Sequence, residues 1–161
     1  MSSIRESAYV YPVIMSIHLT CIALFGGMIA ITDLRLLGWA LPGRSIADVV
    51  QGLRWWKRLG FAIMVSMGLL LAGSKAETYY PNPYFWLKLS LLGLVLIHGI
   101  VFRPRVYNHP EQLDASPALP ARAKVAGAVS LVLWIGILCA GRMIGYYDNP
   151  ADDAPQAVVN R

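Results

Sequence analysis

Residues 12–31 read PVIMSIHLTCIALFGGMIAI, a run of twenty positions whose single acidic or basic side chain is that of His18. A helix needs roughly 20 apolar residues to cross a hydrocarbon core about 30 Å thick. The run therefore predicts a membrane-spanning helix. A histidine several positions inside such a helix is costly in hydrocarbon, which makes His18 a candidate functional residue.

Three further apolar stretches have the length of a membrane span, at residues 55–73, 84–102 and 125–146. A helix satisfies its own backbone hydrogen bonds, which lipid cannot do. Four such helices joined by short connections predict an all-α integral membrane protein, an antiparallel four-helix bundle within residues 1–147. The polar residues 148–161, with two prolines, predict a flexible tail.

The composition restricts the class of protein. Hydrophobic residues make up 57% of the chain and charged residues 14%, which differs from soluble proteins. The 161 residues leave room for one domain. The first apolar run is longer than that of a signal peptide, so the first helix is expected to stay in the protein. Small size and the lack of a carboxylate pair argue against hydrolysis, leaving at most an oxidoreductase subunit.

Lysine and arginine residues predict the orientation of the helices. Nine of them border the first and third connections, against five on the opposite side. The first face is therefore expected in the cytoplasm, with both termini in the periplasm. The net charge of +5 follows the span borders, so nucleic-acid binding is not expected. The nine residues are Arg35, Arg44, Arg54, Lys57, Arg58, Arg103, Arg105, Arg122 and Lys124.

Two histidines lie inside predicted spans, His18 in the first and His98 in the third. Such imidazoles can ligate haem iron, or they can be neutral and hydrogen-bonded within the bundle. The two helices run in the same direction, and the histidines differ in depth by about seven residues, roughly 10 Å. They are therefore expected to serve separate sites, unless errors in the helix ends close the gap. Met67 is then a candidate second ligand beside His18.

Four cationic side chains near the membrane borders are candidates for binding haem propionates. Lys88 and Arg142 lie on the outer side, and Arg103 and Arg105 on the inner side. The alternative for all four is that they extend to lipid headgroups. His109 is expected to be a solvated loop residue.

Acidic residues do not occur in the predicted spans, which argues against an ion carrier. Asp33 and Arg35 follow the first span and are expected to pair locally or to cap its helix.

Copper is an alternative to haem. His18 and Cys21 share one helix face, as do Cys139 and Met143. Imidazole, thiolate and thioether favour copper(I), although Cys and Met also serve as ordinary core residues.

The segment YPVIMSIHLTCIALFGGMIAITDLRLLG resembles the first helix of an uncharacterised family of four-helix bacterial inner-membrane proteins. The stretch YYPNPYFWLKLSLL is similar to the start of that family's third helix. The spacing from His18 to the Gly-Gly pair is distantly similar to membrane domains of copper resistance protein D. The resemblance implies a four-helix fold in a bacterial inner membrane and assigns no reaction. The residues that carry it are Tyr11, Pro12, His18, Gly26, Gly27, Asp33, Leu34, Arg35, Leu36, Leu37, Gly38, Asn82, Pro83, Phe85 and Lys88.

Two functions of different classes follow from these observations. In the first, the chain binds haem b and passes electrons between the membrane quinone pool and a partner redox protein, with His18 and His98 as iron ligands. In the second, it binds no cofactor and serves as a membrane anchor or assembly subunit of a larger complex. A face of small residues predicts a homo-oligomer or a place in a complex. That face contains Gly136, Ala140, Gly141 and Gly145.

Overall fold

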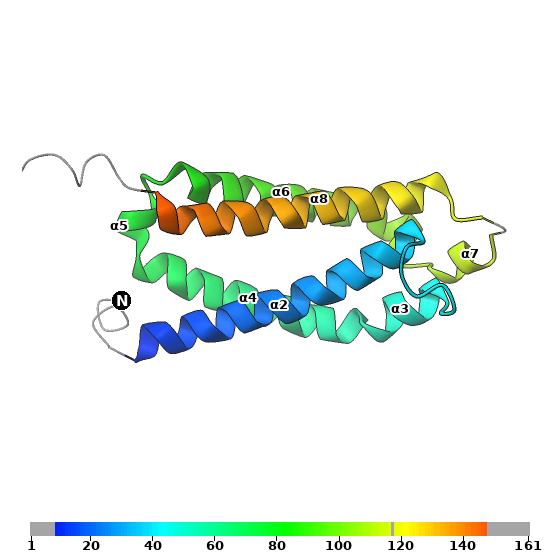
Figure 1. The fold of residues 1–161 in the computed structure, drawn as a ribbon, viewed down its shortest axis with the longest axis horizontal. Coiled ribbons are helices and arrows are strands. Elements are labelled where there is room, and N and C mark those ends of the chain that lie inside the picture. Colours follow the sequence, from blue (N-terminus) through cyan, green and yellow to red (C-terminus); the bar gives the residue numbers. More distant parts are fainter. Residues whose placement is uncertain (1–8, 117, 148–161) are drawn as a thin grey trace, which may run out of the picture.

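The computed structural model describes residues 9–116 and 118–147, within which all regular structure is helical (Figure 1). The predicted tail at 148–161 lies outside the described residues. Four long helices dominate, and short helical segments connect them. The long helices are α2 (Val10–Leu37), α4 (Arg54–Ser74), α6 (Pro83–Phe102) and α8 (Ala121–Met143); the short segments are α3 (Ile46–Gly52), α5 (Ala76–Tyr79), the π-helical turn η1 (Arg103–Tyr107), α7 (Glu111–Asp114) and the 3₁₀ turn η2 (Ile144–Tyr146).

Four segments are long and apolar enough to cross a membrane: Val10–Leu37, Ile46–Ser74, Pro83–Phe102 and Ala121–Tyr146. This confirms the predicted all-helical, multi-pass membrane protein. Large apolar side chains stand exposed on every long helix, for example Leu24, Leu69, Ile100 and Val132. Such a surface is suited to contact with lipid chains.

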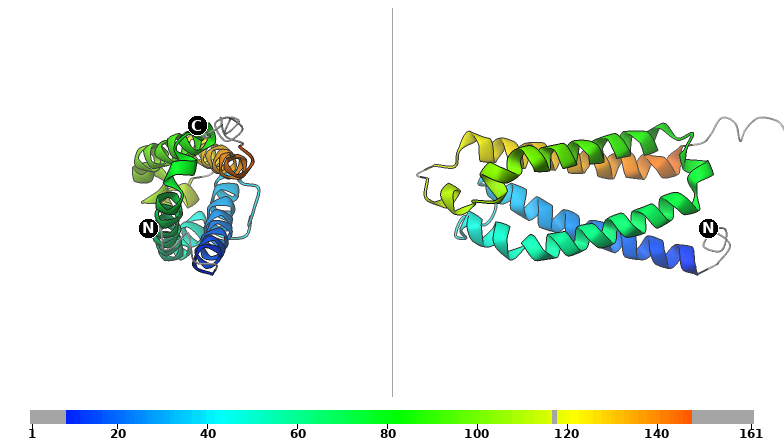
Figure 2. Two further views of the ribbon diagram at one scale, coloured as in Figure 1. Left: turned by 90° about the vertical axis from the view of Figure 1, so that its left-hand side faces the viewer. Right: turned by 180° about the vertical axis from the view of Figure 1, so that it is seen from behind.

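The long helices form two pairs. Helix α2 packs along α4, α6 packs along α8, and α2 also contacts α8. Successive long helices run in opposite directions, and the two pairs separate progressively away from α3 and α7 (Figures 1 and 2). The end formed by α3 and α7 is called the α3–α7 end below. The opposite end, with Val10, the 79–83 turn and Tyr147, is called the terminal end.

A compact apolar cluster closes the α3–α7 end. The Asp114 carboxylate of α7 accepts hydrogen bonds from the backbone N–H groups of Ile46 (2.7 Å) and Ala47 (2.9 Å), at the start of α3. These are N–H groups that a helix leaves unpaired at its first turn. The cap fixes α3 and α7 to each other over the cluster. Its buried members are Leu36, Ile46, Val50, Val106, Leu113, Ala123 and Ala126.

At the terminal end, Asn82 ties α6 to α8. Its side-chain oxygen accepts from the Tyr84 N–H at 3.0 Å, and its amide donates to the Ile144 carbonyl at 3.1 Å. Pro83 occupies the first turn of α6, a position where the missing N–H costs nothing. The Asn82-Pro83 dipeptide thus starts α6 and holds the end of α8.

Helix α2 extends beyond the predicted span, and this corrects one expectation. It continues to Leu37 and ends at Gly38, whose φ of 82° is left-handed. Arg35 does not pair with Asp33; its guanidinium donates to the Arg44 carbonyl at 2.7 and 2.9 Å. Asp33 lies inside the helix and is buried. The prediction of a local pair or cap is therefore wrong.

Candidate functional site

His18 lies in the half of α2 nearer the terminal end, with its ring against α4. A Cβ placed on Gly68 would lie only 3.2 Å from His18 Cε1, so the glycine provides the space for the imidazole. The Met64 carbonyl, one turn along α4, lies close to the ring. Nδ1 is nevertheless buried without a well-formed hydrogen bond. His18 therefore has a nitrogen whose bonding capacity the described residues leave unused.

The second polar side chain of this region is that of Lys88, on α6. Its side chain is half-buried and lies against α8, where a Cβ on Gly141 would meet Nζ at 3.4 Å. The lysine is close enough for its charge to act on His18. Within residues 9–116 and 118–147, the Lys88 ammonium has neither a hydrogen bond nor an acidic partner in contact. A desolvated ammonium without a counter-ion is unfavourable, so this is a place for an anionic group.

The four long helices thus contribute four residues to one region, which we call the His18–Lys88 site: His18, Gly68, Lys88 and Gly141. Each polar side chain is accommodated by a glycine of the neighbouring helix. Arg142 follows Gly141 but is exposed, and its guanidinium donates to the Tyr146 hydroxyl and lies over that ring. Arg142 is therefore engaged on its own helix and does not join the site.

His98 belongs to a different environment. Its Nε2 is 3.0 Å from the Ala126 carbonyl of α8, and its ring lies 4.8 Å from that of Phe102. Because a carbonyl only accepts, Nε2 carries the proton in this contact. Lys88 and His98 are ten residues apart on α6, about 15 Å along a helix. The structure does not bring His98 to the His18–Lys88 site.

Aromatic residues fill the bundle between the two histidines. Phe25 and Trp134 meet edge to face with ring centroids 5.3 Å apart, and Met64 packs with them.

Met67, the predicted second ligand, directly precedes Gly68, so its side chain leaves α4 about 100° away from the direction of Gly68. Met64, one turn from Gly68, shares the glycine's face instead.

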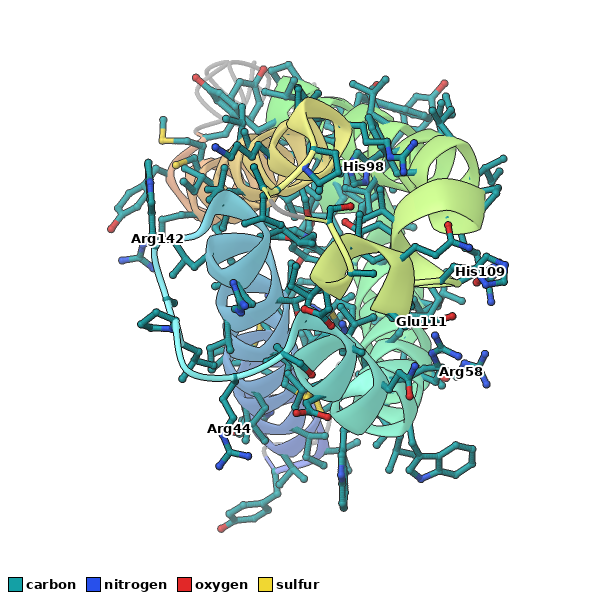
Figure 3. The ribbon with its side chains drawn as sticks, turned by 90° about the vertical axis from the view of Figure 1, so that its right-hand side faces the viewer. Arg44, Arg58, His98, His109, Glu111 and Arg142 are labelled. Atoms are coloured by element: carbon teal, nitrogen blue, oxygen red, sulfur yellow. The ribbon has the colours of Figure 1, made fainter. Side chains whose placement is uncertain are left out.

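The other predicted site residues lie apart. Arg103 is exposed at the α3–α7 end, and the Arg105 side chain lies outside the described residues. His109 is exposed, as predicted for a loop residue, and pairs with Glu111 at 3.5 Å. Figure 3 shows His109 and Glu111 at the edge of the α3–α7 end, away from His98.

The copper candidates differ in burial. Cys21 is half-buried, whereas Cys139 and Met143 are exposed. Within the part of the chain that the structure describes, no three His, Cys, Asp or Glu side chains gather in a metal-binding group.

A second polar group, which the sequence analysis missed, lies toward the α3–α7 end. Asp33 is 2% exposed, and its Oδ2 has no hydrogen-bond partner among the described residues. Lys57 of α4 and Ser130 of α8 lie beside the carboxylate. The Lys57 ammonium donates to the Thr32 hydroxyl at 3.1 Å. Burial, reinforced by the Asp33 charge, raises the pKa of the Tyr107 phenol in η1. These five residues are called the Asp33 cluster.

The family to which the chain belongs is defined by comparison with known proteins. A family model described as a family of unknown function, DUF6644, matches residues 7–147. The chain belongs to the DUF6644 family. The match covers all four long helices and both polar groups, and it agrees with the expected uncharacterised family. It shows no link to copper resistance protein D.

No curated protein matches the chain. No solved structure matches it either.

Proposed function

We propose that this DUF6644 protein is a membrane electron-transfer subunit that binds haem b at the His18–Lys88 site. The observation that carries the proposal is that, among the described residues, an imidazole nitrogen without a hydrogen bond and an ammonium without an acidic partner lie in one region, each against a glycine. Haem offers a group for each: an iron for the imidazole and a carboxylate for the ammonium. Hydrocarbon around both residues makes a purely structural role costly.

The residues fit this group in part. His18 would hold the iron through its imidazole, and Lys88 would supply a cation for a propionate. Gly68 and Gly141 give His18 and Lys88 the room to lie between the helices, because a Cβ at either glycine would press on these side chains. His98 is not the second ligand of the same iron, because its Nε2 is engaged by Ala126 on a distant turn. When bound, haem would supply a one-electron couple whose potential depends on its axial ligand and surroundings.

The remaining parts of the proposal concern the cell. The basic residues favour the cytoplasm for the α3–α7 end and the periplasm for the terminal end. We infer that the protein lies in a bacterial inner membrane. There it would pass electrons between the quinone pool and a partner redox protein. Two of the four small residues proposed for oligomerisation are used inside the chain, since Gly136 faces Leu91 and Gly141 faces Lys88.

The test is the haem content of the purified protein. Wild-type protein, isolated in mild detergent from haem-replete cells, should show a reduced-minus-oxidised b-type spectrum. His18→Ala should abolish it, and Lys88→Met should lower haem occupancy several-fold because a propionate loses its counter-ion. His109→Ala is the matched control, since His109 is exposed, and it should keep the full spectrum.

The outcomes separate the alternatives. A wild type with neither haem nor copper by metal analysis would refute the cofactor proposal and favour the anchor function. Copper without haem would favour the copper alternative. If His98→Ala loses the haem band at unchanged helix content, then His98 also holds the haem. That result would contradict the assignment of the iron ligand to His18 without His98.

A further inference from the structure

The Asp33 cluster combines burial with incomplete hydrogen bonding. Asp33 is 2% exposed, Thr32 is 2% exposed and Ser130 is 6% exposed. A buried carboxylate oxygen without a donor is strongly unfavourable as an anion. Asp33 Oδ2 is such an oxygen. The cluster therefore contains a buried oxygen that is free to accept a hydrogen bond.

Lys57 has hydrogen-bond donors left over, whereas Asp33 has an acceptor left over. Its ammonium has three N–H donors, of which one is used by Thr32 Oγ1. Lys57 lies near Asp33, yet no contact within 4.0 Å is formed between the two charged groups of these described residues. Unused donors and an unused acceptor that lie near each other in a buried cluster are the kind of groups that ordered water satisfies in proteins.

The helix packing fixes Asp33 in this position. A Cβ on Gly127 of α8 would lie 2.8 Å from the Asp33 carbonyl oxygen and 3.2 Å from Leu36 Cβ. The backbones of α2 and α8 therefore touch at the level of the cluster. The backbone at Asp33 cannot move away from α8 without separating the two helices.

Titratable and charged groups surround Asp33 from each packed element. Helix α4 contributes Lys57, and Arg54 acts on it from one turn away. Arg54 also donates to the Tyr107 carbonyl of η1 at 2.8 Å. Helix α8 contributes the neutral Ser130, and His98 of α6 is held by the Ala126 carbonyl.

We propose that Asp33, Lys57 and Ser130 form a water-containing proton-binding site that exchanges protons with the α3–α7 end. In this site the Asp33 carboxylate takes one proton from a hydronium ion, leaving water and a carboxylic acid, and on release it returns the proton to water as hydronium. Protons pass by way of Lys57, because this half-buried side chain lies near the carboxylate and belongs to the first turn of α4, at the α3–α7 end. The site does not depend on haem at the His18–Lys88 site.

Infrared difference spectroscopy as a function of pH tests this proposal on the purified full-length protein. Above about pH 6, where exposed carboxyl groups are ionised, the wild type should show the C=O stretch of a protonated carboxyl group that disappears as pH rises further and that shifts in heavy water. Asp33→Asn should lack this band. Asp48→Asn is the matched control, because Asp48 is an exposed carboxylate at the same end, and it should keep the band.

A second variant keeps the test valid if Asp33→Asn fails to fold. Lys57→Met removes the cation that favours the ionised carboxylate, so the carboxyl band should persist to higher pH than in the wild type. A wild type without any carboxyl band across the accessible pH range would overturn the proposal and leave Asp33 as a permanently ionised structural residue. A band that survives in folded Asp33→Asn would overturn it equally.

Discussion

Tyr79 illustrates how single residues are tuned at the terminal end. Its ring stacks on Phe85 with centroids 5.6 Å apart, and it lies beside Tyr11, whose ring also receives the Lys75 ammonium at 4.3 Å. Burial, with a hydrogen bond to Tyr11, raises the pKa of Tyr79 from 10.0 to about 12. The neutral phenol is thus the form that the fold favours.

The raised pKa predicts a loss of stability at high pH. A group with a raised folded-state pKa contributes stability that is fully present below its unfolded pKa and is lost above it. For Tyr79 the loss should extend from about pH 10 to about pH 12. An absorbance titration of tyrosinate should show a component near pH 12 that is missing from Tyr79→Phe.

Tyr80→Phe is the control for this titration, because Tyr80 is 74% exposed. It should retain the component near pH 12. A Tyr79→Phe variant that still shows the component would contradict the assignment.

At the same scale, the two polar groups differ in how far the sequence revealed them. His18 stands alone in an apolar run, so the cost of a polar group in hydrocarbon was sufficient to single it out. Asp33 follows that run by two positions and looked like a helix end. Asp33 is buried because α2 continues to Leu37 and because Lys57 of α4 and Ser130 of α8 pack beside it. These contacts are part of the tertiary structure, and the hydropathy of a single segment does not predict them.

Among the elements, the junction of α6 and α8 depends on one side chain. Asn82 is 2% exposed and both accepts from Tyr84 N–H and donates to the Ile144 carbonyl. Asn82→Ala should lower the free energy of unfolding by about 2–4 kcal/mol, because a helix cap is lost and a buried carbonyl is left unpaired. Thermal unfolding in mild detergent, followed by circular dichroism, measures the change.

Asn82→Asp separates the two contributions. The aspartate keeps the oxygen that caps α6 but lacks the amide that donates to Ile144, so its loss should be smaller than that of Asn82→Ala if the cap contributes as stated. An equal loss in both variants would assign the whole effect to the bond with Ile144.

The contact of α2 with α8 gives a second prediction at this scale. Gly127→Ala would place its Cβ 2.8 Å from the Asp33 carbonyl oxygen, a backbone atom that cannot move alone. Overpacking of this kind costs about 1–3 kcal/mol. The variant should therefore unfold at lower temperature than the wild type in the same detergent.

Gly93→Ala is the matched control on α6, where a Cβ would meet no heavy atom within 4 Å. Because alanine is the better helix former by up to about 1 kcal/mol, this variant should be unchanged or slightly more stable. Equal destabilisation by both substitutions would show that the α2–α8 contact is not as close as described.

The long helices follow directly from their apolar sequences, whereas the connecting elements do not. Helix α3 occupies residues that the sequence placed in a connection, and its first turn is held by Asp114, 68 positions beyond Ile46. The sequence also places small residues on α8 but does not say which partner they face. Leu91 and Lys88 of α6 occupy two of those positions, so intramolecular packing takes up part of the face expected for oligomerisation.

For the whole molecule, the distribution of charge decides the orientation in the membrane. Arg44 and Arg58 are exposed at the α3–α7 end, where Figure 3 shows them pointing outward. Arg103, Arg122 and Lys124 are exposed from the same part of the chain. Nine of the fourteen lysine and arginine residues border this end. Lysine and arginine in short loops remain on the cytoplasmic side during insertion.

This asymmetry predicts that both termini face the periplasm. Alkaline phosphatase fused after Arg161 should be active, because it folds only outside the cytoplasm, and green fluorescent protein at the same position should be dark. Fusions after Ser116, between α7 and α8, serve as the internal control and should give the opposite pair of results. Active phosphatase after Ser116 together with a fluorescent C-terminal fusion would reverse the orientation. In that case the Asp33 cluster would exchange protons with the periplasm, and the His18–Lys88 site would lie in the cytoplasmic leaflet.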